Sequence, residues 1–196
     1  MKTYFRKIQV IGGSYYVSIP KKEAKRIGLE KGSEINMEVS ENRIVIEPTT
    51  SNNEERVVFT IGYEQRTIED FIRLLKENKI FFLADLRERA FSRKNGFRKG
   101  PLQNELQKNG IIYVGFPSLG APKELREELA KNAQYPNFFK KYKKHMLENI
   151  VHLGALMDLV KKEKTAIMCY ERDYRFCHRK IISEWLEKQG IKLIHL

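Results

Sequence analysis

The sequence has few of the residues and patterns that build secreted or membrane proteins. Its 196 residues include only two cysteines, too few for a disulfide scaffold, so we expect a reducing, cytoplasmic location. No apolar run approaches the ~20 residues of a membrane-spanning helix. The first ten residues, MKTYFRKIQV, lack the apolar core of a secretion signal. We therefore expect a soluble protein with no membrane partner.

Acidic residues are also in the minority. The chain has 37 Lys and Arg residues against 25 Asp and Glu residues, which gives a net charge of +12. An excess of this size predicts a polyanionic partner, with nucleic acid as the first expectation, although lysine-rich surfaces also serve solubility. The remaining composition, 41% hydrophobic and 32% charged, is typical of a folded globular protein with one large domain or two small ones.

The first 48 residues predict two strands, a short helix and two more strands. Gly12-Gly13-Ser14 is a turn signal between the first two strands, and Pro20 suits the first position of a helix over Lys21–Ile27. Ile35–Val39 and Ile44–Ile46 are the closing strands. A domain of this size cannot bury a sufficient core alone, so we expect it to form a homodimer through this domain.

Residues 3–48 resemble the SpoVT-AbrB (AbrB/MazE) family, in a form common in archaea. The resemblance rests on Gly13 before the second strand, Ile19-Pro20-Lys21 at the strand-to-helix junction, Leu29 and Gly32 after the helix, and the closing strand pair. It implies a small swapped-hairpin β-barrel that two chains close together. It also implies DNA binding as the usual role.

Basic residues dominate the start of the chain. Residues 1–29 contain seven Lys or Arg residues and one acidic residue, Glu23. Such cations can bind DNA phosphates without reading the base sequence. The alternative is a dimerisation domain that is merely basic. The expected DNA-binding residues are Lys2, Arg6, Lys7, Lys21, Lys22, Lys25 and Arg26.

Residues 49–56, TTSNNEER, are polar and aperiodic, which predicts a linker, and a second domain spans residues 57–196. In this domain short apolar runs alternate with helical patterns. Continuous apolar strands that alternate with helices predict an α/β domain whose parallel sheet is covered on both faces. The five expected strands are Val57–Ile61, Ile80–Ala84, Ile111–Gly115, Thr165–Cys169 and Ile191–Ile194.

Polar residues follow several of these strands, and the carboxyl ends of parallel strands meet at one edge of a sheet, where ligands bind. The densest group is TAIMCYERDYRFCHR, residues 165–179, which predicts a strand, a loop and a helix. Both cysteines flank this loop. Carboxylates and arginines there could perform acid–base chemistry and hold an anionic substrate. Ordinary ion pairing at loop ends is the alternative for any one of them.

The second domain resembles the domain of unknown function family 488. The matching segments are Thr60-Ile61-Gly62-Tyr63 with Arg66, Asp85-Leu86-Arg87, Ser92-Arg93, Leu119-Gly120, and Cys169-x-Glu171-x5-Cys177-His178-Arg179. This resemblance implies a Rossmann-like domain with a mostly parallel five-stranded sheet, and it names no reaction. The expected catalytic residues are Asp85, Arg87, Cys169, Glu171, Cys177, His178 and Arg179. The expected pocket residues are Gly62, Tyr63, Arg66, Ser92 and Arg93.

Several chemistries are compatible with the cysteine loop. Cys169-x5-Arg175 has the spacing of an anion-binding loop, but it lacks glycine and carries two acids. Cys169, Cys177, His178 and a carboxylate have the ligand types of a zinc site, but adjacent Cys and His rarely close one tetrahedral site. The third is a reactive thiolate at Cys177 or Cys169, because a helix N-terminus and nearby cations favour it. The fourth is structural packing of both cysteines. No metal or cofactor is assigned from the sequence.

Three functions remain open from the sequence. The first is an enzyme that acts on nucleic acid or a nucleotide and is held to DNA by the N-terminal domain. The second is a transcriptional regulator whose α/β domain senses a ligand, a metal or the redox state. The third is a scaffold with buried structural cysteines. The substrate, which could be an anionic small molecule or nucleic acid, stays unknown.

Overall fold

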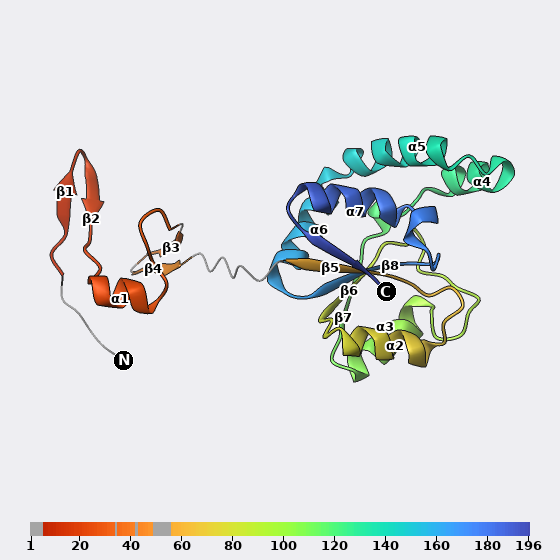
Figure 1. Ribbon diagram of the computed structural model, residues 1–196, viewed down its shortest axis with the longest axis horizontal. Helices are drawn as coiled ribbons and strands as arrows, with labels where there is room; N and C mark the ends of the chain where they lie inside the picture. The colour runs from red at the N-terminus through yellow and green to blue at the C-terminus, as the bar shows by residue number, and fades with distance from the viewer. Residues whose placement is uncertain (1–5, 34, 42, 49–55) are drawn as a thin grey trace. The chain divides into compact units, whose positions relative to one another are not determined.

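The computed structural model describes residues 6–33, 35–41, 43–48 and 56–196 (Figure 1). The chain forms two compact units, Met1–Glu54 and Glu55–Leu196. Lys2 and residues 49–55 of the expected linker lie outside the described residues. In the described ranges, no helix is long and apolar enough to cross a membrane.

The N-terminal unit consists of two antiparallel hairpins and a short helix. β1 (Gln9–Ile11) pairs with β2 (Ser14–Tyr16), and β3 (Ile35–Ser40) pairs with β4 (Arg43–Pro48). α1 (Lys21–Arg26) lies between the hairpins in sequence. Gly12 and Gly13 both have positive φ, 57° and 84°, which the tight turn between β1 and β2 requires. This order of elements confirms the prediction from sequence.

Many apolar side chains of this unit are exposed when one chain is considered. In the second hairpin, Val39 is paired across the ladder with Ile44, and their side chains are 68% and 62% exposed. A single copy therefore leaves an apolar surface in contact with water, at a cost of roughly 25 cal/mol per Å². Other exposed members are Ile8, Val10, Tyr15, Tyr16, Val17, Ile19, Ile35 and Met37.

The C-terminal unit is built around a five-stranded sheet in the order β7-β6-β8-β5-β9, and all its pairings are parallel. This confirms the α/β class and the five strands. β8 lies at the centre of the sheet, between two strands that precede it in the chain. The strands are β5 (Val57–Gly62), β6 (Phe82–Asp85), β7 (Ile112–Gly115), β8 (Thr165–Cys169) and β9 (Lys192–His195).

Helices cover both faces of this sheet (Figure 1). α2 (Ile68–Glu77) and α3 (Lys99–Lys108) lie on one face. α5 (Tyr135–Glu148), α6 (Ile150–Lys162) and α7 (Arg179–Lys188) lie on the other, and α4 (Lys123–Asn132) packs against α5. Alternate strand residues enter the two cores, so the continuous apolar runs are explained by burial on both sides.

The strand ends that carry polar residues are level with one another. Gly62 pairs with Cys169, and Asp85 pairs with both Met168 and Gly115. The loop after β8 lies directly on β5, because a Cβ atom added to Gly62 would be 1.9 Å from the carbonyl oxygen of Glu171. Glycine is therefore required at position 62 for close approach of the two backbones.

Candidate functional site

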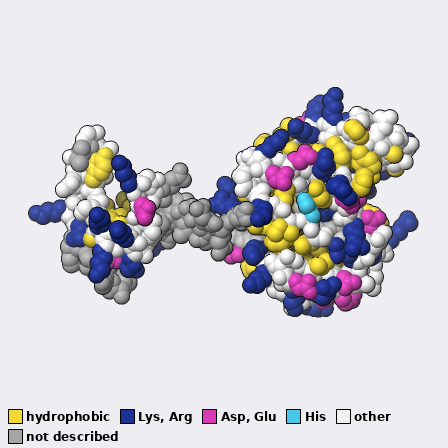
Figure 2. All heavy atoms as spheres, in the orientation of Figure 1, with side chains coloured by type: hydrophobic (Ala, Val, Ile, Leu, Met, Phe, Trp, Pro, Cys, Tyr) yellow, Lys and Arg dark blue, Asp and Glu magenta, His cyan; other side chains and the backbone are white. Residues whose placement is uncertain are grey.

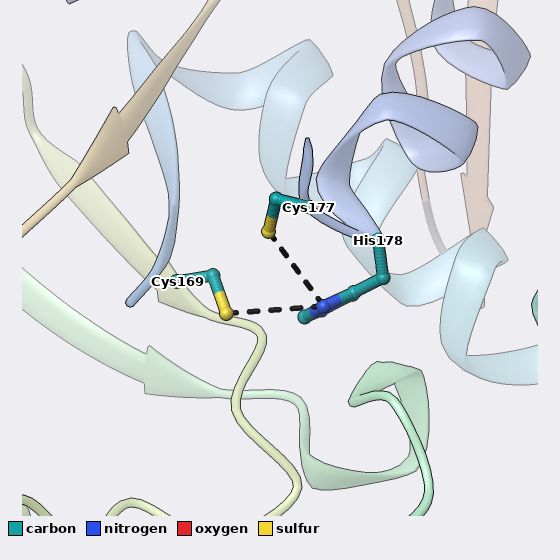
Figure 3. A group of neighbouring side chains, drawn as sticks. All are labelled: Cys169, Cys177 and His178. Atoms are coloured by element: carbon teal, nitrogen blue, oxygen red, sulfur yellow. Dashed lines mark hydrogen bonds between the residues drawn. The ribbon is translucent and has the colours of Figure 1, made fainter. Parts of the chain in front are cut away.

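Three side chains converge at the carboxyl end of β8. Cys169 ends that strand, while Cys177 and His178 precede α7 (Figure 3). The Cys169 Sγ atom lies 3.8 Å from the His178 Nδ1 atom, and the Cys177 Sγ atom lies 3.7 Å from it. The two sulfurs and this nitrogen all lie within 4.8 Å of one another, and all three residues are buried.

The local backbone explains how adjacent residues reach one point. Sequence reasoning places Cys177 and His178 on a helix, where neighbours point about 100° apart. The structure corrects this, because Cys177 is extended (φ −122°, ψ 149°) and only His178 is helical (φ −57°, ψ −22°). The 3-10 turn η2 (Tyr174–Phe176) ends at Cys177. The break between the two helical segments lets both side chains turn toward Cys169.

The His178 ring is held by the rest of the core. Its Nε2 atom lies 3.0 Å from the Leu86 carbonyl oxygen, and a carbonyl can only accept, so Nε2 carries a hydrogen. The ring also packs against Tyr142 at 5.0 Å between centroids. Nδ1 is therefore the nitrogen that faces the two sulfurs.

The two thiols have opposite tendencies to ionise. Burial acts to raise the pKa of Cys177, but a hydrogen bond from Cys169 and the charges of His178 and Arg179 outweigh it, so this pKa is well below its usual value. The pKa of Cys169 is well above its usual value, because it donates that hydrogen bond and is buried. Burial acts to lower the pKa of His178, but the neighbouring Cys177 raises it. A thiolate is therefore favoured at Cys177.

Arg179 and Glu171 complete the polar cluster. The Arg179 side chain is fully buried, and its Nε atom donates to the Cys177 sulfur at 3.3 Å. Its Nη2 atom donates to the backbone carbonyl of Glu171, which ties the loop after β8 to α7. The buried Glu171 Oε2 atom has no hydrogen-bond partner among the described residues. Burial and the nearby Cys177 raise the pKa of Glu171 to about 7.

Asp85 and Arg87 form a buried ion pair beside this cluster. The Arg87 Nη2 atom lies 2.6 Å from the Asp85 Oδ2 atom, and the hydroxyl of Tyr113 donates to the same oxygen at 2.8 Å. Arg87 also donates to the Tyr63 hydroxyl and to the Phe97 carbonyl oxygen, at 3.2 and 2.7 Å. The pair thus anchors the loop between β6 and α3, and Asp85 orients Arg87.

A cavity of about 920 Å³ opens above the cluster. Seven residues that the sequence predicts for the site line it, namely Tyr63, Arg87, Ser92, Arg93, Cys169, Glu171 and His178. Five other predicted site residues do not line it, namely Gly62, Arg66, Asp85, Cys177 and Arg179. Arg66 donates to the carbonyl oxygen of Gly62 at 3.0 Å, which fixes the end of β5.

Both units of the chain match a known protein family. The family model for the Domain of unknown function DUF488 matches residues 67–186, more than half of the chain. The chain belongs to the DUF488 family. The model for Antidote-toxin recognition MazE, bacterial antitoxin, matches residues 8–54. Both resemblances seen in the sequence are thereby confirmed. A search of curated proteins and a search of solved structures gave no match.

The DUF488 domain contributes cavity residues that sequence reasoning missed. They come from the loop after β6, from α4, from the start of α5 and from the loop after β8. The aromatic residues and cations of these segments were the available signal, but those of α4 and α5 follow no strand end. The missed residues include Glu88, Arg89, Phe91, Lys123, Arg126, Leu129, Tyr135, Phe138, Tyr170 and Phe176.

The cysteine loop of this domain does not have the geometry of an anion-binding loop. The guanidinium of Arg175 lies 2.7 Å from the Asp173 carboxylate, and both side chains are partly exposed. Arg175 is not among the cavity-lining residues. Arg175 and Asp173 form an ion pair and neutralise each other's charge.

Basic side chains gather on the N-terminal unit, as Figure 2 shows. Lys21, Lys22 and Lys25 of α1 are exposed, and so are Arg6 and Lys7 before β1. The Arg26 Nε atom lies 2.6 Å from the Glu23 Oε2 atom, so its charge is partly neutralised. The lysines of α1 are thus accessible to a polyanion.

Proposed function

We propose that this protein is a DNA-bound enzyme that acts on a nucleotide unit, either within nucleic acid or free. The cavity of the DUF488 domain carries this proposal. Its rim is cationic, its walls are aromatic and its floor contains a thiol, an imidazole and a carboxylate. At about 920 Å³ it lies within the range of ligand pockets, ~300–1,000 Å³.

The walls and rim suit the two parts of a nucleotide. The rings of Phe91, Tyr170 and Phe176 line the cavity and are 61%, 47% and 51% exposed, so a base could stack on them. Arg89 and Arg93 are exposed at the cavity, and the described residues place no acid within ion-pairing distance of them. Such arginines suit a phosphate group.

The floor supplies groups that can move protons. Cys169, His178 and Glu171 line the cavity, and Cys169 and His178 are almost fully buried. A thiol, an imidazole and a carboxylate in one partly dry site are the groups that acid–base and nucleophilic catalysis use. Their position at the cavity, beside its aromatic and cationic residues, is the reason to propose an enzyme.

The N-terminal unit would hold the enzyme on DNA as a homodimer. Its exposed apolar strands need a second copy to close a core, and its α1 lysines can contact phosphates. Changing Lys21, Lys22 and Lys25 together to Ala should weaken binding to duplex DNA. It should also reduce the slope of log K against log salt by ~0.9 for each phosphate that is no longer neutralised. A change of Lys140, Lys143 and Lys144 on α5, which are equally exposed, is the matched control.

Binding of deoxynucleoside monophosphates to the full chain tests the cavity. By isothermal titration calorimetry, the monophosphates should bind more tightly than the corresponding nucleosides. Phe176→Ala should weaken their binding by about 10-fold or more, because stacking contributes ~1–3 kcal/mol per base. Arg93→Ala should remove the preference for the phosphate. Phe81→Ala and Arg73→Ala change exposed residues that do not line the cavity and should have no effect.

Turnover is tested separately, with single-stranded and duplex oligonucleotides and the four monophosphates as substrates and mass spectrometry of the products. Product formation by the wild type is compared with that by Glu171→Gln. A product that the wild type forms and the variant does not supports the enzymatic function. The cavity does not hold a nucleotide if the monophosphates fail to bind to the wild type. The same conclusion follows if Phe176→Ala and Arg93→Ala bind them as tightly as the controls Phe81→Ala and Arg73→Ala do.

A second function is favoured by the match to the MazE antitoxin model. In that case the DUF488 cavity would bind a nucleotide without changing it and would alter the DNA affinity of the N-terminal unit. The two functions differ in one measurement. A regulator shows nucleotide-dependent DNA binding and no product, whereas an enzyme shows product.

A further inference from the structure

We propose that Cys169, Cys177 and His178 bind a divalent transition-metal ion of the zinc class, with one coordination position open to the cavity. The site needs only small side-chain adjustments, because the three donor atoms already point toward one another (Figure 3). The proposal goes beyond the nucleotide function and does not depend on it.

The distances between the donor atoms agree with tetrahedral coordination. Zinc lies ~2.3 Å from a thiolate sulfur and ~2.0–2.1 Å from an imidazole nitrogen, which places the sulfur and nitrogen about 3.6 Å apart. The observed separations from His178 Nδ1 are 3.8 Å for Cys169 and 3.7 Å for Cys177. An ion would therefore fit between the three atoms with small side-chain adjustments.

The surroundings of the ligands have the features of a metal site. A metal-binding histidine usually donates its other ring N–H to a carbonyl or carboxylate, and His178 Nε2 lies 3.0 Å from the Leu86 carbonyl oxygen. That bond leaves Nδ1 free to coordinate. The Cys177 sulfur accepts from the Nε atom of the buried Arg179 at 3.3 Å. With two thiolates, a divalent ion, Arg179 and Glu171 ionised, the charges of the buried cluster cancel.

Two thiolates and one imidazole also select the kind of ion. Soft sulfur ligands disfavour magnesium and calcium, and tetrahedral sulfur and nitrogen ligands are typical of zinc. Catalytic zinc sites have three protein ligands and keep the fourth position for water or substrate. Structural zinc sites have four protein ligands, and among the described residues the cluster has three.

The fourth position would face the cavity. Cys169 and His178 line the cavity, whereas Cys177 does not. Glu171 lines the same floor, and its buried Oε2 atom has no hydrogen-bond partner in the described part of the chain. That oxygen would accept a hydrogen bond from a water on the ion. The arrangement places a metal-bound water or substrate atom below the aromatic walls.

Titration with Co²⁺ tests the site directly, without any nucleotide present. The sample is the full chain with reduced thiols, after a chelator has removed bound metal. One equivalent should produce sulfur-to-cobalt charge-transfer bands and the intense visible bands of tetrahedral cobalt, and Zn²⁺ should displace it. Cys169→Ser, Cys177→Ser and His178→Asn should each weaken binding by more than about 100-fold, which exceeds the loss from outer-shell changes. His152→Asn removes an exposed histidine of α6 and is the control.

A measurement on the wild-type chain alone keeps the proposal testable if a variant at a buried position fails to fold. One equivalent of Zn²⁺ should slow alkylation of both thiols of the folded wild type, and a chelator should reverse this. Glu171→Gln should retain the cobalt spectrum, because Glu171 is not a ligand. The proposal is overturned if the wild type shows no sulfur-to-cobalt bands, or if Zn²⁺ leaves both alkylation rates unchanged. It is also overturned if His178→Asn and His152→Asn bind Co²⁺ equally.

Discussion

Replacement of Gly62 by alanine tests how the loop after β8 is held. The new Cβ atom would lie 1.9 Å from the carbonyl oxygen of Glu171 and 2.7 Å from the Cα atom of Arg172. Ordinary contacts of a Cβ atom begin at 3.4 Å, so the loop backbone has to move by about 1.5 Å. No rotamer change can relieve a clash with backbone atoms.

The expected cost follows from this displacement. Overpacking of a filled core costs ~1–3 kcal/mol and occasionally more, and we expect the upper end because both sides of the contact are backbone. With an m-value of ~2 kcal/mol/M, a loss of about 3 kcal/mol lowers the urea midpoint by roughly 1.5 M. Trp185 on α7 is the single tryptophan of the chain, so its fluorescence reports unfolding of the DUF488 domain.

Gly154→Ala is the matched control for this change. Gly154 lies inside α6, and a Cβ atom there would meet no atom within 4 Å. The variant should gain about 0.5–1 kcal/mol, because glycine is unfavourable in a helix interior. A Gly62→Ala protein that is as stable as the wild type would refute the contact between β5 and the loop. If the contact is correct, Gly62→Ala should also weaken cobalt binding, because the loop joins Cys169 to Cys177.

Three further predictions concern other parts of the chain. Asp85→Asn should destabilise the DUF488 domain by about 3–5 kcal/mol in urea, because Arg87 is left as an uncompensated buried charge; an unchanged midpoint would contradict the ion pair. Val39→Asp should make the full chain monomeric in light scattering, whereas Val151→Asp, at an exposed position of α6, should not; a Val39→Asp dimer would exclude this surface. Burial and the charge of Arg179 lower the pKa of His195, so the folded state binds this proton less readily than the unfolded state. Stability should therefore fall as the pH decreases below about 6.5, and His195→Asn should reduce that dependence; equal pH profiles would contradict it.

The elements of the fold were predictable where a strong local pattern coincides with burial. The run Thr165–Cys169 is buried at every position, so its apolar character alone predicts an interior strand. Likewise Thr67 caps α2 by accepting from the Asp70 amide at 3.1 Å, as its position before acidic residues indicates. The order of strands was not predictable, because no local signal states that β8 lies between β5 and β6.

The candidate site was predictable to the extent that it lies at strand ends. Cys169 ends β8, Glu171 and Arg87 follow strands, and topology brings all three together at one edge. The walls of the cavity depend on how α4 and α5 pack over that edge, which is a tertiary effect without a short sequence signal. Sequence reasoning named Cys177 and His178 for the site but disfavoured their convergence on one point, because that convergence depends on a backbone break just before α7.

The position of β8 also has a consequence for the order in which the chain folds. Both neighbours of β5 in the sheet, β8 and β9, lie more than 100 residues later in the sequence. As the ribosome releases the chain, β5 and β6 emerge early but cannot pair with each other, because β8 has to enter between them. Such long-range pairing is intrinsically slow. The N-terminal hairpins, by contrast, contain only local pairings, so two nascent chains could begin to associate before either sheet is complete.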